Sequence, residues 1–251
     1  MSADRRAPRK RFGQHFLHDR GVLARLVAAI APAPGEHIVE IGPGLGALTR
    51  PLLERAGALT AIEIDRDLAV ELEALRGLKI VRADALKTDY ASYPPGFRIV
   101  GNLPYNISTP LLFHLARSAR HARDLHFMLQ LEVVERMVAA PSTPDYGRLS
   151  VALQTRFAMK KLFSVAPGCF RPPPKVDSAV VRLVPLGKGP DCDEKILDEL
   201  LRKAFSARRK TLRNALRLGE RDFQALEIDP GLRPENLAPA DYVRIARRLA
   251  A

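Results

Sequence analysis

Val39-Glu40-Ile41-Gly42-Pro43-Gly44-Leu45-Gly46 is the stretch of sequence that decides the fold. Its first residues belong to the apolar run 37–41, which predicts a short buried strand. Glycines follow at once, where they let the backbone turn sharply and approach a ligand at the carboxyl edge of a sheet. Their spacing is Gly-x-Gly-x-Gly. A dinucleotide fingerprint requires Gly-x-Gly-x-x-Gly, so this spacing disfavours an NAD-linked dehydrogenase.

Short apolar runs and helical patterns alternate on both sides of this stretch. Before it, apolar residues recur at helical spacing over 19–30 and predict an opening helix. Strands alternating with helices continue after it and indicate an α/β fold with a parallel sheet. The further predicted strands are 59–64, 78–81, 97–101 and 126–131, and the predicted helices between several of them are 47–56, 66–75 and 110–118.

The last part of the chain has a different pattern. Two β-rich stretches, 162–165 and 176–184, have no helix between them and predict an antiparallel pair at a sheet edge. After the Gly/Pro-rich hinge 185–190, only helical patterns remain. We therefore predict two domains, residues 1–186 with the sheet and a basic N-terminal arm, and residues 187–251 as a small all-α domain. The helices expected in the second domain are 193–205, 211–216, 221–226 and 240–249.

The composition bounds the function. The 251 residues carry 40 Lys+Arg against 28 Asp+Glu, a net charge of +12 that attracts polyanions. One basic cluster lies in the first eleven residues, and another contains Arg208, Arg209, Lys210, Arg213 and Arg217. Either cluster alone could be a solvated face, but two of them favour a nucleic acid.

The cysteines and the hydropathy pattern indicate the cellular compartment and bear on disulfide, metal and membrane sites. The 2 cysteines are in no Cys-x-x-Cys pair and beside no spaced histidines, so we expect neither a disulfide framework nor a metal site. No apolar run is long enough for a membrane span, and no apolar h-region follows the basic start. We expect a monomer in the cytoplasm, without membrane contact.

Two acidic residues follow the next predicted strands. Glu63 ends the second strand, where a carboxylate can accept both ribose hydroxyls of a nucleoside. Asp84 follows the third strand and could accept from an adenine amino group. Alone, Glu63 could be an exposed acid at a strand end and Asp84 a turn residue or helix N-cap, but the glycine loop in combination with Glu63 favours a bound nucleoside.

Asn102-Leu103-Pro104-Tyr105 directly follows the predicted strand 97–101. The Asn102 side-chain oxygen and a backbone carbonyl near Leu103 could accept both N–H groups of an exocyclic amine. These hydrogen bonds would localise the nitrogen lone pair and align it with a methyl sulfonium. Tyr105 would stack on the base and stabilise its developing positive charge. The tetrapeptide thus indicates methyl transfer to a nucleobase, although a structural proline turn could have the same short sequence.

Together with Arg11-Phe-Gly-Gln-His-Phe-Leu17 and Phe170-Arg-Pro-Pro-Pro-Lys-Val-Asp-Ser178, these motifs resemble the ribosomal RNA adenine dimethyltransferases, most closely the bacterial small-subunit branch. The resemblance spans residues 10 to 250. It implies a class I, Rossmann-like S-adenosylmethionine-dependent methyltransferase with a mostly parallel seven-stranded sheet, helices on both faces and a small helical C-terminal domain. The implied reaction is dimethylation of two adjacent adenosines near the 3′ end of 16S rRNA in the 30S particle, during ribosome biogenesis.

The resemblance also implies the site residues. Phe170 would face Tyr105 across an extruded base. His15 departs from the family members that have Asn there. The implied catalytic set is Asn102, Leu103, Pro104, Tyr105 and Phe170; the cofactor set is His15, Leu17, Gly42, Gly44, Glu63, Asp84, Ala85 and Asn102; and the RNA set is Arg208, Arg209, Lys210, Arg213 and Arg217.

Two alternatives remain at this stage. A related enzyme class methylates 23S rRNA and confers macrolide resistance, and it shares the glycine loop and an Asn-x-Pro-aromatic motif. The full Asn102–Ser108 and Phe170–Ser178 strings favour the small-subunit branch. The other alternative is a nonenzymatic nucleic-acid-binding factor on the same fold, which the intact cofactor and target motifs disfavour.

Overall fold

The computed structural model describes residues 14–216 and 218–250. The chain divides into two compact units. The first holds the chain up to Val134 together with Lys160–Pro185, and the second holds Glu135–Met159 and Leu186–Ala251. The last of these junctions lies between Pro185 and Leu186, one residue before the predicted boundary, which stays a prediction. The units differ from the predicted domains in grouping Glu135–Met159 with the C-terminal helices, because the helix Arg148–Gln154 in this segment packs against the helices Glu194–Ser206 and Pro239–Ala250.

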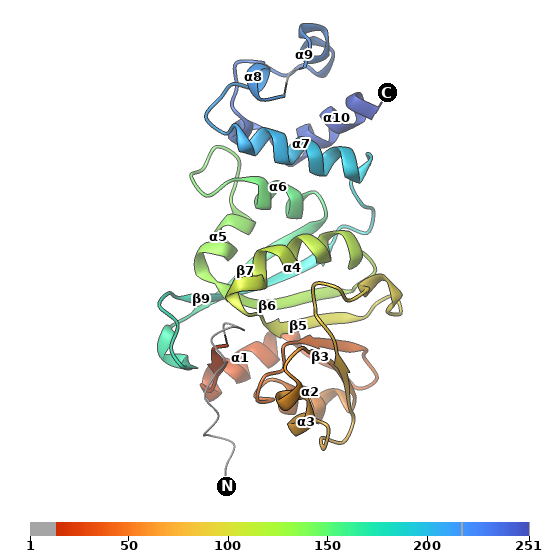
Figure 1. Cartoon of the computed structure of the whole chain (residues 1–251), viewed down its shortest axis with the longest axis vertical. Helices are drawn as coiled ribbons and strands as arrows, with labels where there is room; N and C mark the ends of the chain where they lie inside the picture. The colour runs from red at the N-terminus through yellow and green to blue at the C-terminus, as the bar shows by residue number, and fades with distance from the viewer. Residues whose placement is uncertain (1–13, 217, 251) are drawn as a thin grey trace. The chain divides into compact units, whose positions relative to one another are not determined.

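A seven-stranded sheet within the described residues forms the centre of the first unit, with the strand order β4-β3-β2-β5-β6-β9-β7 (Figure 1). The pairs β4-β3, β3-β2, β2-β5 and β5-β6 are parallel, and β9 runs antiparallel to β6. This confirms the predicted α/β fold with a mostly parallel sheet. The strands are β2 (Ile38–Ile41), β3 (Leu59–Glu63), β4 (Leu78–Arg82), β5 (Arg98–Asn102), β6 (Asp124–Gln130), β7 (Phe157–Val165) and β9 (Ser178–Pro185).

Helices cover the sheet, and the strands between them are buried. In Figure 1, α4 lies on the opposite side of the strands from α1. The side chain of Asp19 accepts a hydrogen bond from Val22 N at 2.8 Å and so begins α1, as the predicted opening helix requires. The helices of this unit are α1 (Arg20–Ile30), α2 (Thr49–Ala56), α3 (Arg66–Leu72) and α4 (Tyr105–Ser118), and α5 (Leu131–Val138) runs across the division between the units.

A second, two-stranded sheet was not predicted. It pairs β1 (Phe16–Leu17) with β8 (Phe170–Arg171) in antiparallel register, Leu17 opposite Phe170. Each strand has only two residues, which is too short for the hydrophobic alternation that identifies a strand in the sequence. The pairing brings the first and last motifs of the sequence together at one place.

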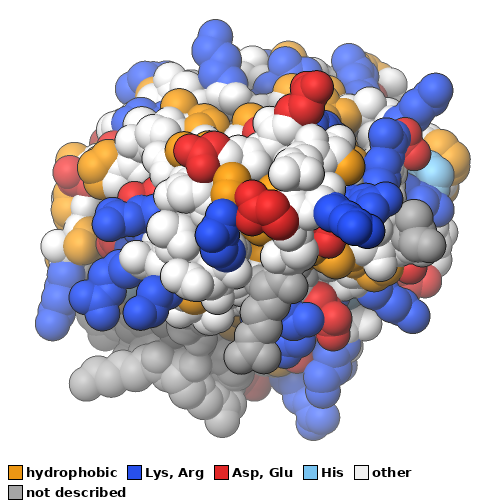
Figure 2. Space-filling model, turned by 90° about the horizontal axis from the view of Figure 1, so that it is seen from above, with side chains coloured by type: hydrophobic (Ala, Val, Ile, Leu, Met, Phe, Trp, Pro, Cys, Tyr) orange, Lys and Arg blue, Asp and Glu red, His pale blue; other side chains and the backbone are white. Residues whose placement is uncertain are grey.

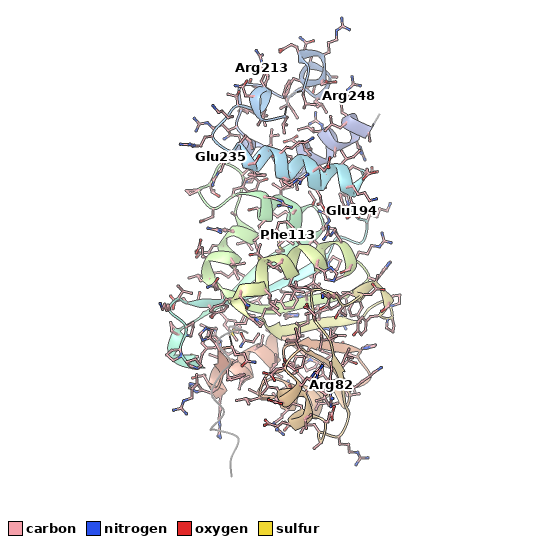
Figure 3. The ribbon with its side chains drawn as sticks, in the orientation of Figure 1. Arg82, Phe113, Glu194, Arg213, Glu235 and Arg248 are labelled. Carbon is pink, nitrogen blue, oxygen red and sulfur yellow. The ribbon has the colours of Figure 1, made fainter. Side chains whose placement is uncertain are left out.

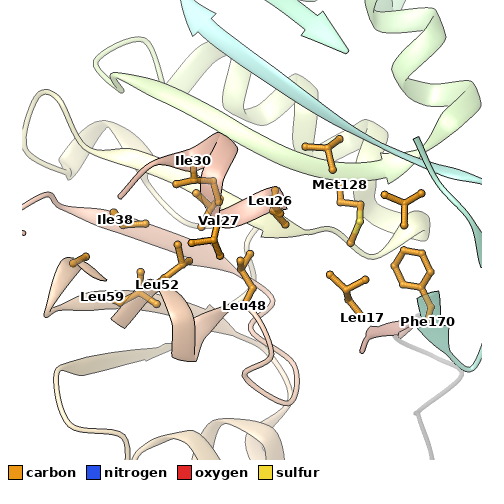
Figure 4. Close-up of a cluster of buried hydrophobic side chains, with 14 residues drawn as sticks. Leu17, Leu26, Val27, Ile30, Ile38, Leu48, Leu52, Leu59, Met128 and Phe170 are labelled. Carbon is orange, nitrogen blue, oxygen red and sulfur yellow. The ribbon is translucent and has the colours of Figure 1, made fainter. Parts of the chain in front are cut away.

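One continuous hydrophobic cluster fixes α1 and α2 against the sheet (Figure 4). Leu26, Val27 and Ile30 of α1 meet Ile38 of β2 in this cluster, and each is at most 2% exposed. Burying such side chains contributes about 1.5–3 kcal/mol each. The cluster extends to Leu17, Met128 and Phe170, so the same core supports the two-stranded sheet.

A buried cluster of charged residues lies at the C-terminal end of α1. Arg98 at the start of β5 donates to Asp124 at 2.7 and 3.0 Å, to Glu36 at 2.9 Å and to the Ile30 carbonyl at 2.6 Å. Arg98 thereby satisfies a terminal carbonyl of α1 and neutralises both acids. Burial alone would raise the pKa of Asp124. The hydrogen bonds and positive charge of Arg98 outweigh this effect and lower the pKa.

His126 on β6 lies in this cluster without a good partner. Its ring is 3.7 Å from Asp124, and neither ring nitrogen makes a hydrogen bond of normal geometry within the described part of the chain. Burial, together with the charges of Arg98 and Arg182, outweighs the attraction of Asp124 and lowers the pKa of His126 from 6.5 to about 4. His126 is therefore neutral in the folded protein at pH 7.

We predict that His126 makes the fold sensitive to acid. Between pH 6.5 and 4 the unfolded chain binds a proton at this histidine and the folded chain does not, so stability falls as pH falls, by about 2–4 kcal/mol in total. His126→Leu should flatten the free energy of unfolding between pH 6.5 and 4, measured by urea titration. Asp124 and Glu36, whose pKa values are lowered, lose their contribution at more acidic pH in both proteins. Equal slopes for both proteins above pH 4 would contradict this role.

The second unit is helical, as predicted, and several of its charged side chains form ion pairs. Glu194 pairs with Arg156 at 3.0 Å, Arg248 pairs with Asp222 at 3.0 Å, and Arg208 pairs with Glu235. Figure 3 labels Glu194, Arg248 and Glu235 on this unit. The helices are α6 (Arg148–Gln154), α7 (Glu194–Ser206), α8 (Leu212–Leu216), α9 (Glu220–Leu226) and α10 (Pro239–Ala250). Helix α6 was not predicted. No helix in residues 14–216 or 218–250 is long and apolar enough to cross a bilayer.

Candidate active site

A cavity of about 1060 Å³ opens at the carboxyl ends of β2, β3 and β5, where parallel sheets of this kind bind ligands. Its wall is formed by the glycine loop after β2, the ends of β3 and β4, the start of α4, and the β1 and β8 segments. Every predicted catalytic and cofactor-site residue lines it, namely His15, Leu17, Gly42, Gly44, Glu63, Asp84, Ala85, Asn102, Leu103, Pro104, Tyr105 and Phe170. Their roles stay predictions, but the chain does bring them together.

Glu63, the last residue of β3, is held in one orientation by backbone donors. Its carboxylate accepts from Asp65 N at 2.9 Å and, at 3.4 Å, from Gly44 N. Burial raises the pKa of Glu63, and these N–H donors oppose the shift. The remaining lone pairs of a carboxylate fixed in this way can accept from a pair of ligand hydroxyls.

Asp84 follows β4 on the neighbouring part of the wall. One carboxylate oxygen accepts from Leu86 N at 2.9 Å, which fixes the turn that carries Ala85. The other oxygen is left to accept from an amino group. The exposed side chain of Ile64 also lines the cavity and adds apolar surface to its wall. Together Glu63, Ile64 and Asp84 present the acceptors and apolar surface that a nucleoside requires.

The glycine loop is covered by an aromatic ring. Gly44 has φ +57°, and a Cβ at this position would lie 3.1 Å from the ring of Phe16. A side chain there would be strained and would push β1 away from the loop. The loop glycine therefore allows the N-terminal motif to pack directly on the ligand-binding turn.

Asn102 is anchored through its nitrogen. Its Nδ2 donates to the backbone carbonyl of His15 at 2.9 Å, which leaves Oδ1 as the acceptor. The backbone N of Leu103 donates to the Met128 carbonyl at 3.1 Å and fixes the turn after β5. The tetrapeptide thus presents an oriented amide oxygen at the cavity, which is the acceptor that the sequence prediction requires.

Tyr105, the first residue of α4, joins the distal motif to the tetrapeptide. Its hydroxyl is 2.6 Å from Ser178 Oγ at the end of the proline-rich segment. The ring of His15 stacks on Tyr105, with centroids 5.3 Å apart and an interplanar angle of 30°. His15 is itself held by a 2.8 Å hydrogen bond between Nδ1 and the Pro172 carbonyl. Tyr105 is therefore held at its hydroxyl by Ser178 and on its ring by His15.

Phe170 was expected to face Tyr105 across a base, and the structure gives it different neighbours. Its side chain lines the cavity but is only 2% exposed, and it packs in the cluster with Leu17 and Met128 (Figure 4). The β1-β8 pairing places Phe170 opposite Leu17 and directs it into this core. A stacking role for Phe170 stays a prediction.

Sequence reasoning missed Glu40 as a site residue. This second-to-last residue of β2 lines the cavity and is 2% exposed. An acid inside an otherwise apolar parallel strand is itself a signal, since such strands are usually continuous hydrophobic runs.

The predicted RNA-contact residues differ in their surroundings. Arg208 pairs with Glu235 and donates to the Pro144 carbonyl at 2.8 Å, and Arg213 pairs with Glu220 at 2.9 Å. Arg209 and Lys210 are exposed, and no acid of the described chain pairs with them. The predicted contacts of Arg217 and of the N-terminal basic cluster lie outside the described residues. Figure 2 shows one face on which Lys and Arg side chains outnumber acidic ones.

Comparisons with known proteins agree on one family. The family model described as ribosomal RNA adenine dimethylase matches residues 5–251. The chain is 58% identical to "Ribosomal RNA small subunit methyltransferase A" of Aromatoleum aromaticum, covering 97% of this chain and 94% of the relative. It is 57% identical to the protein of that name in Thiobacillus denitrificans, covering 97% and 98%.

Solved structures extend the similarity to the fold. A dimethyladenosine transferase from Plasmodium falciparum superimposes with a TM-score of 0.78 at 28% identity, covering 92% of this chain and 96% of that one. The 23S rRNA methyltransferase ErmE superimposes with a TM-score of 0.69 at 26% identity, covering 94% and 100%. Both likenesses span the sheet and the helical C-terminal region.

Proposed function

Because this chain belongs to the ribosomal RNA adenine dimethylase family, we propose that it transfers methyl groups to the 6-amino groups of two adjacent adenosines near the 3′ end of 16S rRNA. The single observation that carries the chemistry is the orientation of Asn102, whose Nδ2 is bound by the His15 carbonyl so that Oδ1 is left to accept from the target amine. The enzyme is an adenine methyltransferase of ribosomal RNA, and the choice of 16S rRNA rests on the relatives' names.

The residues of the cavity fit S-adenosylmethionine as the donor. Glu63 would accept from the ribose hydroxyls, and Asp84 with the backbone at Ala85 would hold the adenine. Both carboxylates already have their orientation set by backbone N–H groups. When bound, this cofactor supplies an electrophilic methyl group on a sulfonium. Within the described residues no cluster of His, Cys, Asp or Glu could hold a metal ion.

Asn102 and Tyr105 would prepare the target nitrogen. Asn102 Oδ1 and a backbone carbonyl of the tetrapeptide accept the two N–H groups of the adenine amine, which localises its lone pair towards the methyl carbon. As the N–C bond forms and the S–C bond breaks, the ring of Tyr105 stabilises the positive charge on the base. The methylated nitrogen then releases a proton to water, since the cationic amine is acidic and requires no strong general base.

The second candidate function is methylation of 23S rRNA, because ErmE shares the fold across nearly the whole chain. We expect methyl transfer from labelled S-adenosylmethionine to 30S particles from unmethylated cells, and little transfer to isolated 23S rRNA. Faster labelling of 23S rRNA would favour the second candidate. Failure of the protein to bind the cofactor in a titration would instead indicate a nonenzymatic RNA-binding factor.

RNA contact by the exposed basic residues gives a further prediction. Replacing both Arg209 and Lys210 by alanine should weaken binding to 30S particles and lower the slope of log affinity against log salt by about 1.4–1.8, since each phosphate contact releases counterions. Arg208→Ala should have a smaller effect on the slope, because Glu235 already neutralises that charge. The matched control replaces Arg55 and Arg76, exposed cations of the first unit. An unchanged slope in the Arg209/Lys210 variant would contradict the assignment.

A further inference from the structure

Ser178 is a buried polar residue at the end of the proline-rich segment 170–178, and the proposed chemistry gives it no role. It is the first residue of β9, and its side chain is 0% exposed. Its Oγ lies 2.6 Å from the hydroxyl oxygen of Tyr105, within the normal range for an O–H···O hydrogen bond. This bond joins the distal motif of the sequence to the tetrapeptide that begins with Asn102.

The backbone around Ser178 is held by the sheet and by the start of the next helix. Ser178 pairs with Gln130 in the antiparallel register of β9 with β6. The carbonyl of Asp177 accepts a hydrogen bond from the backbone N of Leu131, the first residue of α5, at 2.9 Å. Ser178 Oγ therefore has a fixed position, which is what the support of another side chain requires.

Tyr105 depends on such support more than a core residue does. Its side chain is only partly buried and lines the cavity. The backbone at the start of α4 fixes the Cα of Tyr105, but the ring can still turn about its own side-chain bonds. The ring of His15 stacks on that of Tyr105, and the bond to Ser178 holds its hydroxyl end. Loss of the hydroxyl bond leaves the stacking on His15 as the remaining restraint of these two.

The hydroxyl of Tyr105 is suited to orient the ring and not to accept a proton. Burial raises the pKa of Tyr105 above its usual value, and the hydrogen bond with Ser178 opposes this shift. The hydroxyl therefore stays protonated at pH 7. In this pair one hydroxyl donates and the other accepts, and no proton leaves the pair.

The orientation of the ring matters for the charge that develops on the base. A cation is attracted by the face of an aromatic ring within about 6 Å of its centroid, because the face carries the negative part of the ring quadrupole. The target nitrogen must also stay aligned with the methyl carbon, and a misplacement of about 1 Å can cost about 10²-fold in rate. A turned Tyr105 ring would weaken both effects.

We propose that Ser178 is a positioning residue for methyl transfer, which keeps the face of the Tyr105 ring towards the target adenine through the bond between their hydroxyls. Ser178 acts only through Tyr105 and touches neither the base nor the methyl donor. This inference rests on the proposed function, because it takes Tyr105 as the residue that stacks on the base.

A double-mutant cycle on kcat tests the proposal. Ser178→Ala should lower kcat for methyl transfer to 30S particles about tenfold, with KM for the particles and the affinity for S-adenosylhomocysteine within about twofold of wild type. Tyr105→Phe keeps the ring and removes the same bond from the other side, so it should cost the same factor. The double variant should also lose about tenfold and not about a hundredfold, because both substitutions remove one interaction.

Ser150→Ala is the matched control. Ser150 is also 0% exposed, and its Oγ donates to the carbonyl of Arg136 in the second unit. This variant should lose stability as Ser178→Ala does but keep the wild-type kcat. A wild-type kcat in Ser178→Ala or in Tyr105→Phe, or a hundredfold loss in the double variant, would overturn this inference and leave the proposed function intact.

The wild-type protein separates the inference from the proposed function. Absence of methyl transfer by the wild type would overturn both. Tyr105→Phe decides the inference even if Ser178→Ala does not fold, since it removes the bond without changing the buried end of β9.

Discussion

Replacing Asn102 by alanine is expected to lower kcat for methyl transfer about 10³-fold, with little change in cofactor affinity. The variant loses the Oδ1 acceptor that localises the lone pair of the target amine, and interactions of this kind contribute about 10²–10³-fold each. It also loses the 2.9 Å bond that positions the His15 carbonyl, so the wall of the base site loosens. Single-turnover transfer to 30S particles measures the effect on chemistry separately from product release.

Binding and a matched amide separate chemistry from folding in this experiment. The affinity of Asn102→Ala for S-adenosylhomocysteine should stay within about threefold of wild type, since Glu63 and Asp84 hold the nucleoside. Gln224→Ala, which removes an exposed amide of α9 outside the predicted RNA set, should retain full activity. Turnover of Asn102→Ala within tenfold of wild type would show that another group activates the amine.

Gly101→Ala is expected to destabilise the first unit by about 2–4 kcal/mol and to lower activity in whatever protein folds. A Cβ at this position would lie 2.5 Å from the backbone oxygen of Ile41, and backbone cannot yield as a flexible side chain can. Strand β5 must therefore shift from β2, and Asn102 at its end shifts with it. Urea titration measures the loss of stability.

Gly168→Ala is the matched control for this substitution. A Cβ at Gly168 would meet nothing within 4 Å, so the free energy of unfolding should stay close to that of the wild type. Equal stability of the two variants would show that the close approach of Gly101 to Ile41 has little energetic weight.

Much of the first unit could be predicted because its signals are local. The run ending in Ile41 and the three glycines after it predict a strand and a turn, and the structure has both. The likeness to ribosomal RNA adenine dimethyltransferases was also confirmed, together with the fold and the methyltransferase activity that it implied. These conclusions depend on short segments with a clear hydrophobic period or a specific motif.

Other features depend on contacts that a local pattern does not contain. The pairing of Leu17 with Phe170 joins segments far apart in the chain, and it places Phe170 in the hydrophobic cluster as well as in the cavity wall. The pairing of Arg208 with Glu235 likewise removes a charge that the sequence counts as free. The functional roles of the site residues and the domain boundary after 186 stay predictions.

The most direct test of the central claim is labelled methyl transfer to 30S particles from unmethylated cells, followed by nucleoside analysis of the 16S rRNA. We expect N6,N6-dimethyladenosine as the product, at two adjacent positions near the 3′ end, and about 10³-fold slower formation with Asn102→Ala. Absence of dimethyladenosine from the 16S rRNA, in a protein that binds S-adenosylmethionine, would contradict the proposed function.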